Sequence, residues 1–106
     1  MRTDSFEIKA KLTLYSTDKG GRVTGIKTEY RPNHVFEYEN GKLKQTYIGQ
    51  ITFNDREWIL PGETSIVNIE FLDLFDIRRF ISIGRIWWIH EGANRIGEAE
   101  IIETNE

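Results

Sequence analysis

The residues whose side chains are suited to chemistry are scattered along the chain. His34 and His90 are the two histidines, they fall in different predicted strands, and neither has Asp or Glu at the spacing of a metal site. Asp73 and Asp76 lie three residues apart in a predicted exposed loop, where solvated charges are expected rather than a glycosidase-like acid and base. We therefore predict no metal site and no catalytic carboxylate pair.

The sequence also predicts no activated nucleophile and no phosphate-binding loop. Ser65 and Ser82 have no histidine with an orienting acid nearby in the sequence, so no triad-like arrangement is predicted. The segment 19–22, Lys-Gly-Gly-Arg, lacks the eight-residue pattern that ends in Gly-Lys-Ser/Thr, and no helix is predicted after it. It is predicted to form a turn. We expect a protein that is not an enzyme, with no catalytic, cofactor-binding or metal-binding residue.

Length and composition bound the remaining possibilities. The chain has 106 residues, the size of one domain, and residues 1–106 are assigned to a single unit. Fourteen basic and seventeen acidic residues give a net charge of -3, which does not predict a broad nucleic-acid surface. The absence of cysteine excludes disulfides and thiol chemistry. Without an apolar leader or a long apolar run, we expect no membrane segment and a cytoplasmic location.

The elements that position these side chains are predicted to be strands. Residues 8–14 alternate apolar and polar side chains with a period of two, which indicates a half-buried strand. A second strand is predicted over 29–39, a segment rich in aromatic residues. Asn40-Gly41 is a strong hairpin signal and turns the chain into a third strand over 42–53.

The second half of the chain continues this pattern. Residues 60–63, Leu-Pro-Gly-Glu, predict a type II turn, because proline fixes φ at the first central position and glycine accepts positive φ at the second. Val67, Ile69 and Phe71 alternate with other residues in a further strand, and 73–80 is predicted as a loop or short helical turn. Short strands with frequent turn signals and no helical period predict an all-β barrel or sandwich.

Five motifs follow one another along the chain. They are Gly-Gly-Arg at 20–22, Tyr-Arg-Pro at 30–32, Pro-Gly-Glu at 61–63, Gly-Arg-Ile-Trp-Trp-Ile-His-Glu-Gly at 84–92, and a closing strand over 95–101. In type and order they resemble the third domain of elongation factor Tu, the carboxy-terminal β-barrel of that GTPase. The resemblance implies an antiparallel Greek-key barrel of six or seven strands, with one hairpin, at Asn40-Gly41, extended beyond the family's length.

The resemblance implies binding rather than catalysis. In elongation factor Tu the third domain has no catalytic residues; it packs on the nucleotide-binding domain, touches the T-stem of aminoacyl-tRNA and meets the exchange factor. The GTPase domain has no counterpart in these 106 residues, so no GTP binding is expected. Among tRNA-contacting positions, Glu91 and Gly92 match, Asn33 replaces a glutamine, and a family threonine falls near Ile48. These replacements, with the negative net charge, predict at most weak tRNA binding.

The strand 84–92 carries the candidate partner surface. The resemblance places Trp87 and Ile89 in the core and Ile86, Trp88 and His90 on the outer face. In the family two of these three outer positions hold cations, which favour phosphate, and their replacement by an isoleucine and an imidazole favours a protein partner. The alternative is that the longer Asn40-Gly41 hairpin folds over this face and buries Trp88 within the monomer.

Two functions therefore stay open. The first is a non-catalytic binding module, a stand-alone relative of the factor's third domain, that acts through protein–protein contact, either on a translation component or as an immunity protein or inhibitor. The second is a tRNA- or ribosome-associated binding protein. Sequence does not identify the partner or the oligomeric state.

Overall fold

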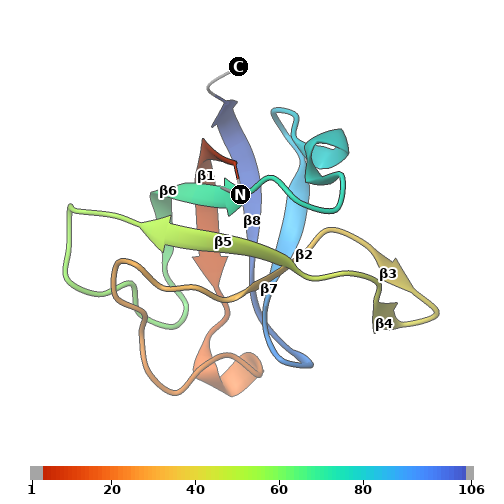
Figure 1. Ribbon diagram of the computed structural model, residues 1–106. Helices are drawn as coiled ribbons and strands as arrows, with labels where there is room; N and C mark the ends of the chain where they lie inside the picture. Colours follow the sequence, from red (N-terminus) through yellow and green to blue (C-terminus); the bar gives the residue numbers. More distant parts are fainter. Residues whose placement is uncertain (1–3, 105–106) are drawn as a thin grey trace.

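The structure, a computed structural model, describes residues 4–104 and is all-β (Figure 1). Residues 1–3, on which the prediction of no leader segment partly rests, and residues 105–106 lie outside the described part. Six strands close into a barrel, and two short strands form a separate hairpin sheet. The elements are β1 (Ser5–Leu14), a 3-10 turn η1 (Thr17–Lys19), β2 (Asn33–Val35), β3 (Tyr38–Glu39), β4 (Lys42–Leu43), β5 (Tyr47–Thr52), β6 (Thr64–Leu72), a 3-10 turn η2 (Ile77–Phe80), β7 (Ile86–Glu91) and β8 (Asn94–Thr104).

The barrel strands run in the order β1-β6-β5-β2-β7-β8, and β8 pairs with β1 to close the ring. Every pairing is antiparallel. The predicted all-β antiparallel barrel with one extended hairpin is therefore confirmed, and the hairpin forms a two-stranded sheet of its own. Within residues 4–104, no helix has the length and apolar composition needed to cross a membrane.

The barrel interior is filled by the alternating residues that the sequence indicated. Ile8 and Leu12 of β1 pair with Ile69 and Ser65 of β6, and these positions all face inward. Trp87 of β7 lies in the centre and is fully buried. Aromatic rings surround it, since those of Phe36, Phe71 and His34 all have centroids within 6.2 Å of the Trp87 indole. This aromatic cluster and the aliphatic side chains around it form one continuous core, whose burial stabilises the barrel.

The predicted turns are confirmed by their backbone angles. Gly20 and Gly62 both have φ of 89°, a left-handed conformation that glycine adopts without steric cost. The amide of Glu63 donates to the carbonyl of Leu60 at 3.0 Å, which closes the turn around Pro61 and Gly62. At the hairpin tip, φ is 52° at Asn40 and 76° at Gly41, as a tight two-residue hairpin requires.

The predicted strand over 29–39 is wrong in extent. The structure has β2 at Asn33–Val35 and then β3 at Tyr38–Glu39, which leaves the barrel and pairs only with β4. Glu29 has φ of 73°, incompatible with a strand, and Tyr30 makes a single bridge to Ile51. The partner segment 42–53 is likewise divided into β4 and β5. By contrast, the predicted loop or helical turn at 73–80 is confirmed by η2.

Candidate protein-binding surfaces

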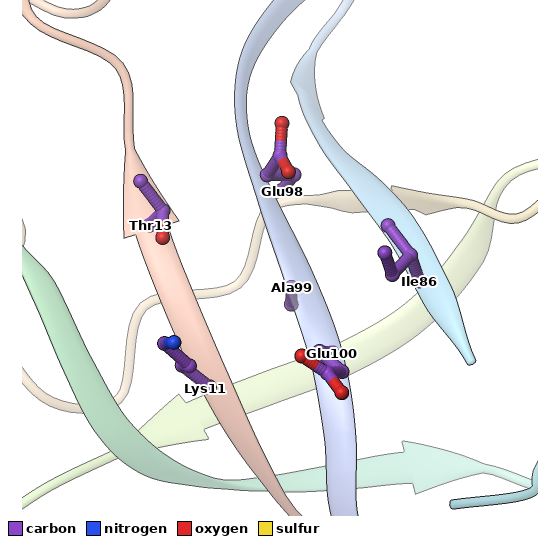
Figure 2. A pocket seen from close by; sticks show the side chains of 6 residues that line it. All are labelled: Lys11, Thr13, Ile86, Glu98, Ala99 and Glu100. Carbon is purple, nitrogen blue, oxygen red and sulfur yellow. The ribbon is translucent and has the colours of Figure 1, made fainter. Parts of the chain in front are cut away.

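The sequence analysis selected the outer face of β7, which continues onto the neighbouring strands β8 and β1 (Figure 2). Ile86 is 46% exposed there and lies opposite Glu100 of β8, which in turn lies opposite Lys11 of β1. Figure 2 shows Glu98 and Glu100 between the side chains of Ile86 and those of Lys11 and Thr13. The hollow among them has a volume of about 130 Å³. Ile86 is thus accessible, at the edge of a small depression with a mixed polar and apolar lining.

Trp88 is half-buried because the β3–β4 hairpin packs against it. The ring of Tyr38 on β3 meets the indole edge-on, with centroids 5.2 Å apart. The guanidinium of Arg95 lies 5.2 Å from the indole centroid and 4.7 Å from that of Tyr38. Trp87 is buried as predicted, and the prediction that its neighbour faces the other side of the sheet agrees with these contacts. The hairpin covers part of Trp88, which was the alternative left open by the sequence.

His90 does not lie on an open surface, so this part of the predicted partner face is corrected. Its side chain is only 3% exposed. The alternation of β7 places His90 beside Trp88, but Tyr38 covers both, and the Tyr38 hydroxyl lies 2.5 Å from Nε2 of His90. Burial lowers the pKa of His90, the backbone of Gly92 and Ala93 raises it, and Arg95 lowers it further. The imidazole of His90 is therefore a contact of the hairpin.

The three predicted tRNA-contact positions lie close together. Asn33 of β2 is exposed and pairs with His90, next to Glu91, and with Ile48 of β5. Gly92 follows in the β7–β8 turn with φ of 60°. The carboxylate of Glu91 accepts hydrogen bonds from Arg22 and Tyr30, so it is already engaged within the monomer.

Arg22 of the Gly-Gly-Arg motif holds a loop in place through hydrogen bonds within the chain. Besides Glu91, its guanidinium donates to the carbonyl of Thr24 at 3.1 Å and to that of Gly25 at 3.3 Å. It thereby fixes the loop between η1 and the barrel. Burial, followed by the contact with Glu91, raises the pKa of Tyr30 above its ordinary value. Gly21 is also constrained, since an added Cβ would lie 2.0 Å from the Tyr15 carbonyl oxygen.

A larger apolar hollow lies between two loops and was not predicted from the sequence. Its exposed walls are Val23, Trp58 and Leu60, which are 84%, 41% and 50% exposed. We call this site the loop hollow; its volume is about 560 Å³, and it is lined by Thr17, Val23, Thr24, Gly25, Trp58, Leu60 and Pro61. None of these residues is titratable, so the hollow offers apolar contact rather than acid–base chemistry.

Backbone hydrogen bonds hold the loop hollow in shape. Ile26 and Ile59 form an isolated bridge with N–O distances of 2.9 and 3.0 Å, which joins the two loops. Because Ile59 points inward, Trp58 and Leu60 on either side of it point outward. That alternation is the one signal in the sequence that could have revealed the hollow. At the rim, Lys27 lies 4.8 Å from the Trp58 ring centroid and pairs with Glu57 at 3.8 Å.

The groups considered for chemistry are engaged elsewhere or isolated. His34 is fully buried, accepts a hydrogen bond from the Trp87 indole at 3.0 Å, and has its pKa lowered to about 4 by burial. Ser65 is buried in β6, and Asp73 pairs with Arg78 at 2.8 Å. Among residues 4–104, no three His, Asp or Glu side chains are grouped to hold a metal ion. No protein-family model matches the chain.

Proposed function

We propose that the protein is a non-catalytic module that binds another protein through the loop hollow. The observation that supports this is the exposure of Val23, Trp58 and Leu60 around one hollow. Contiguous exposed apolar side chains mark interaction sites, and tryptophan is enriched among residues that dominate binding energy. The rim charges Lys27 and Glu57 are paired with each other, so the hollow favours an uncharged, apolar side chain of the partner.

We also propose that the module is a relative of the third domain of elongation factor Tu without its GTPase domain. Support comes from the closed antiparallel barrel and from the positions of the motifs, with Gly-Gly-Arg and Pro-Gly-Glu both in tight turns. On this proposal residues 1–106 form one Greek-key domain located in the cytoplasm, and the partner is a translation component or the target of an immunity protein or inhibitor. Ile86, next to the hairpin-covered Trp88, is a secondary contact.

Affinity capture with a matched pair of variants tests the proposal. Leu60→Ser removes an apolar wall of the loop hollow, whereas Ile66→Ser changes an isoleucine of similar exposure, 51%, on the outer face of β6. We expect Leu60→Ser to weaken the binding of captured protein by about 2 kcal/mol, roughly 30-fold, while Ile66→Ser binds as the unsubstituted chain does. Equal binding by all three proteins would reject the loop hollow.

Ribonuclease treatment of the same samples distinguishes protein binding from the alternative, binding to tRNA or the ribosome. If the captured material is a tRNA or ribosome complex, ribonuclease should release it, and Asn33→Asp should weaken capture because it adds negative charge beside the RNA phosphates. Asn33 is exposed and lies next to the Gly92 turn, which makes it the informative position. Capture that survives ribonuclease but is lost in Leu60→Ser supports the protein-binding function.

A further inference from the structure

Tyr38 makes the closest contacts between the β3–β4 hairpin and the barrel. Its hydroxyl lies 2.5 Å from Nε2 of His90, and Nε of Arg95 donates to the same hydroxyl at 3.1 Å. Its ring lies against Trp88. The hairpin shares no strand pairing with the barrel, because β3 and β4 form a two-stranded sheet of their own.

The remaining contacts of the hairpin are exposed ion pairs, and a cavity lies between it and the barrel. Ion pairs at its base join Glu37 to Lys44 at 4.0 Å and to Arg79 at 3.6 Å, and all three side chains are well exposed. Exposed pairs of this kind contribute little to stability. A cavity of about 390 Å³ separates the hairpin from the barrel, lined by Tyr38, Gly41, Lys42, Leu43, His90 and Ala93. The hairpin is therefore loosely packed apart from the contacts of Tyr38.

The contact between Tyr38 and His90 depends on the protonation of the imidazole. Since Arg95 donates to the Tyr38 oxygen, the phenolic proton is directed to Nε2, which accepts it only while His90 is neutral. Protonation turns Nε2 into a donor, so the Tyr38 hydroxyl keeps this contact only by turning its own proton away and accepting from both Nε2 and Arg95. It also places a positive charge beside Arg95.

The backbone of Gly92 and Ala93 favours a protonated His90, but the charged side chains around it do not. Arg95 of β8 and Tyr38 of β3 face the imidazole, and Lys42 of β4 lines the same cavity. Opposite it, β2 presents the neutral Asn33. The nearest carboxylate along the strand, that of Glu91, is bound by Arg22 and Tyr30.

From this geometry we propose that the β3–β4 hairpin is a pH-sensitive strap, closed over Trp88 while His90 is neutral and loosened when His90 is protonated. The lowered pKa of His90 agrees with this direction, since the closed form then favours the neutral imidazole. The strap is held fully at pH above the ordinary histidine value of about 6.5 and weakens as the pH falls below it. Uptake of one proton changes the ratio of closed to open forms by at most about tenfold per pH unit. Opening uncovers Trp88 next to the exposed Ile86, a surface distinct from the loop hollow.

Acrylamide quenching of Trp88 fluorescence tests the strap. The measurement uses a Trp58→Phe background, which removes the exposed indole of the loop hollow, while the fully buried Trp87 supplies a constant signal. We expect quenching to increase as the pH is lowered from about 8 to about 5.5, with a midpoint below the ordinary histidine value. His34, with its pKa of about 4, stays neutral over this range.

Two variants and one measurement without substitution complete the test. Tyr38→Phe keeps the ring but removes the hydroxyl, so quenching should be high at both pH values. His90→Gln keeps an acceptor that does not titrate, so quenching should be low at both. In the unsubstituted chain, hydrogen exchange is measured and corrected for intrinsic rates. The protection of residues 38–43 should decrease as the pH is lowered, while the protection of β1 and β6 should not. Quenching and hairpin protection that do not change with pH would overturn the proposal.

Discussion

Adjacent tryptophans in β7 should respond very differently to truncation, and Trp87 gives the larger effect. Its indole is fully buried and stacks on Phe36 with centroids 5.3 Å apart. Its Nε1 donates to Nδ1 of His34 at 3.0 Å. Trp87→Ala therefore removes the largest side chain of the core and leaves a buried nitrogen without its donor.

The magnitude follows from these two losses. Truncation of a buried tryptophan costs about 3 to 5 kcal/mol, and an unsatisfied buried polar atom adds about 1 to 3 kcal/mol. A domain of this size has a total stability of about 5 to 15 kcal/mol, so a loss of about 4 to 8 kcal/mol in Trp87→Ala unfolds the domain if its stability lies in the lower part of that range. Trp87→Phe separates the loss of packing from the loss of the hydrogen bond. It refills much of the volume but still leaves His34 without the indole N–H.

Trp88→Ala provides the matched comparison. This side chain is half-buried, and the substitution loses an edge-on contact with Tyr38 and a cation–π contact with Arg95. We expect a loss of about 1 kcal/mol in the free energy of unfolding. Urea denaturation followed by far-ultraviolet circular dichroism measures all three variants without relying on tryptophan emission. Equal losses for Trp87→Ala and Trp88→Ala would refute the assignment of the two indoles to opposite sides of β7.

Three further predictions follow from single features. Gly62→Val should lower stability by about 1 kcal/mol or more, because Gly62 has φ of 89°, and an unchanged melting temperature would contradict the strained turn. We expect no GTP binding and at most weak, salt-sensitive tRNA binding by filter assay, and sub-micromolar affinity for aminoacyl-tRNA at physiological salt would disprove this. His34 has its pKa lowered from 6.5 to about 4, so stability is full above pH 6.5 and should fall by about 3 kcal/mol at most as the pH drops to about 4. Denaturation at several pH values should show a flatter dependence for His34→Gln.

Strands β1 and β6 and two turns were predictable, because short stretches of sequence determine them. In β1 and β6 one face is buried in the barrel, so the side chains alternate in type, and the pattern identifies both strands. Asn40-Gly41 and Gly62 were predictable because their turns require backbone angles that few residues adopt. The separation of Trp87 from Trp88 came from the resemblance to the third domain of elongation factor Tu, which placed Trp87 in the core.

What local sequence left out is long-range packing. The segment 29–39 has the composition of a strand, but only its central residues pair in the barrel, and Tyr38 continues into the hairpin. The resemblance gave the outward direction of His90 but not the tyrosine that covers it. The loop hollow was missed because Val23 and Trp58 are far apart in sequence and meet only through the bridge between Ile26 and Ile59.

The closed ring of barrel strands restricts how this protein meets other chains. Since β8 pairs with β1, the ring has no first or last strand, and a partner cannot extend it by β-augmentation. Recognition at the barrel must therefore read side chains instead of backbone. Open strand edges occur in the hairpin sheet, where β3 and β4 are two residues each and carry Glu39 and Lys42. Short, charged edges of this kind are poor templates for aggregation, so the backbone of this fold offers few sites for uncontrolled assembly.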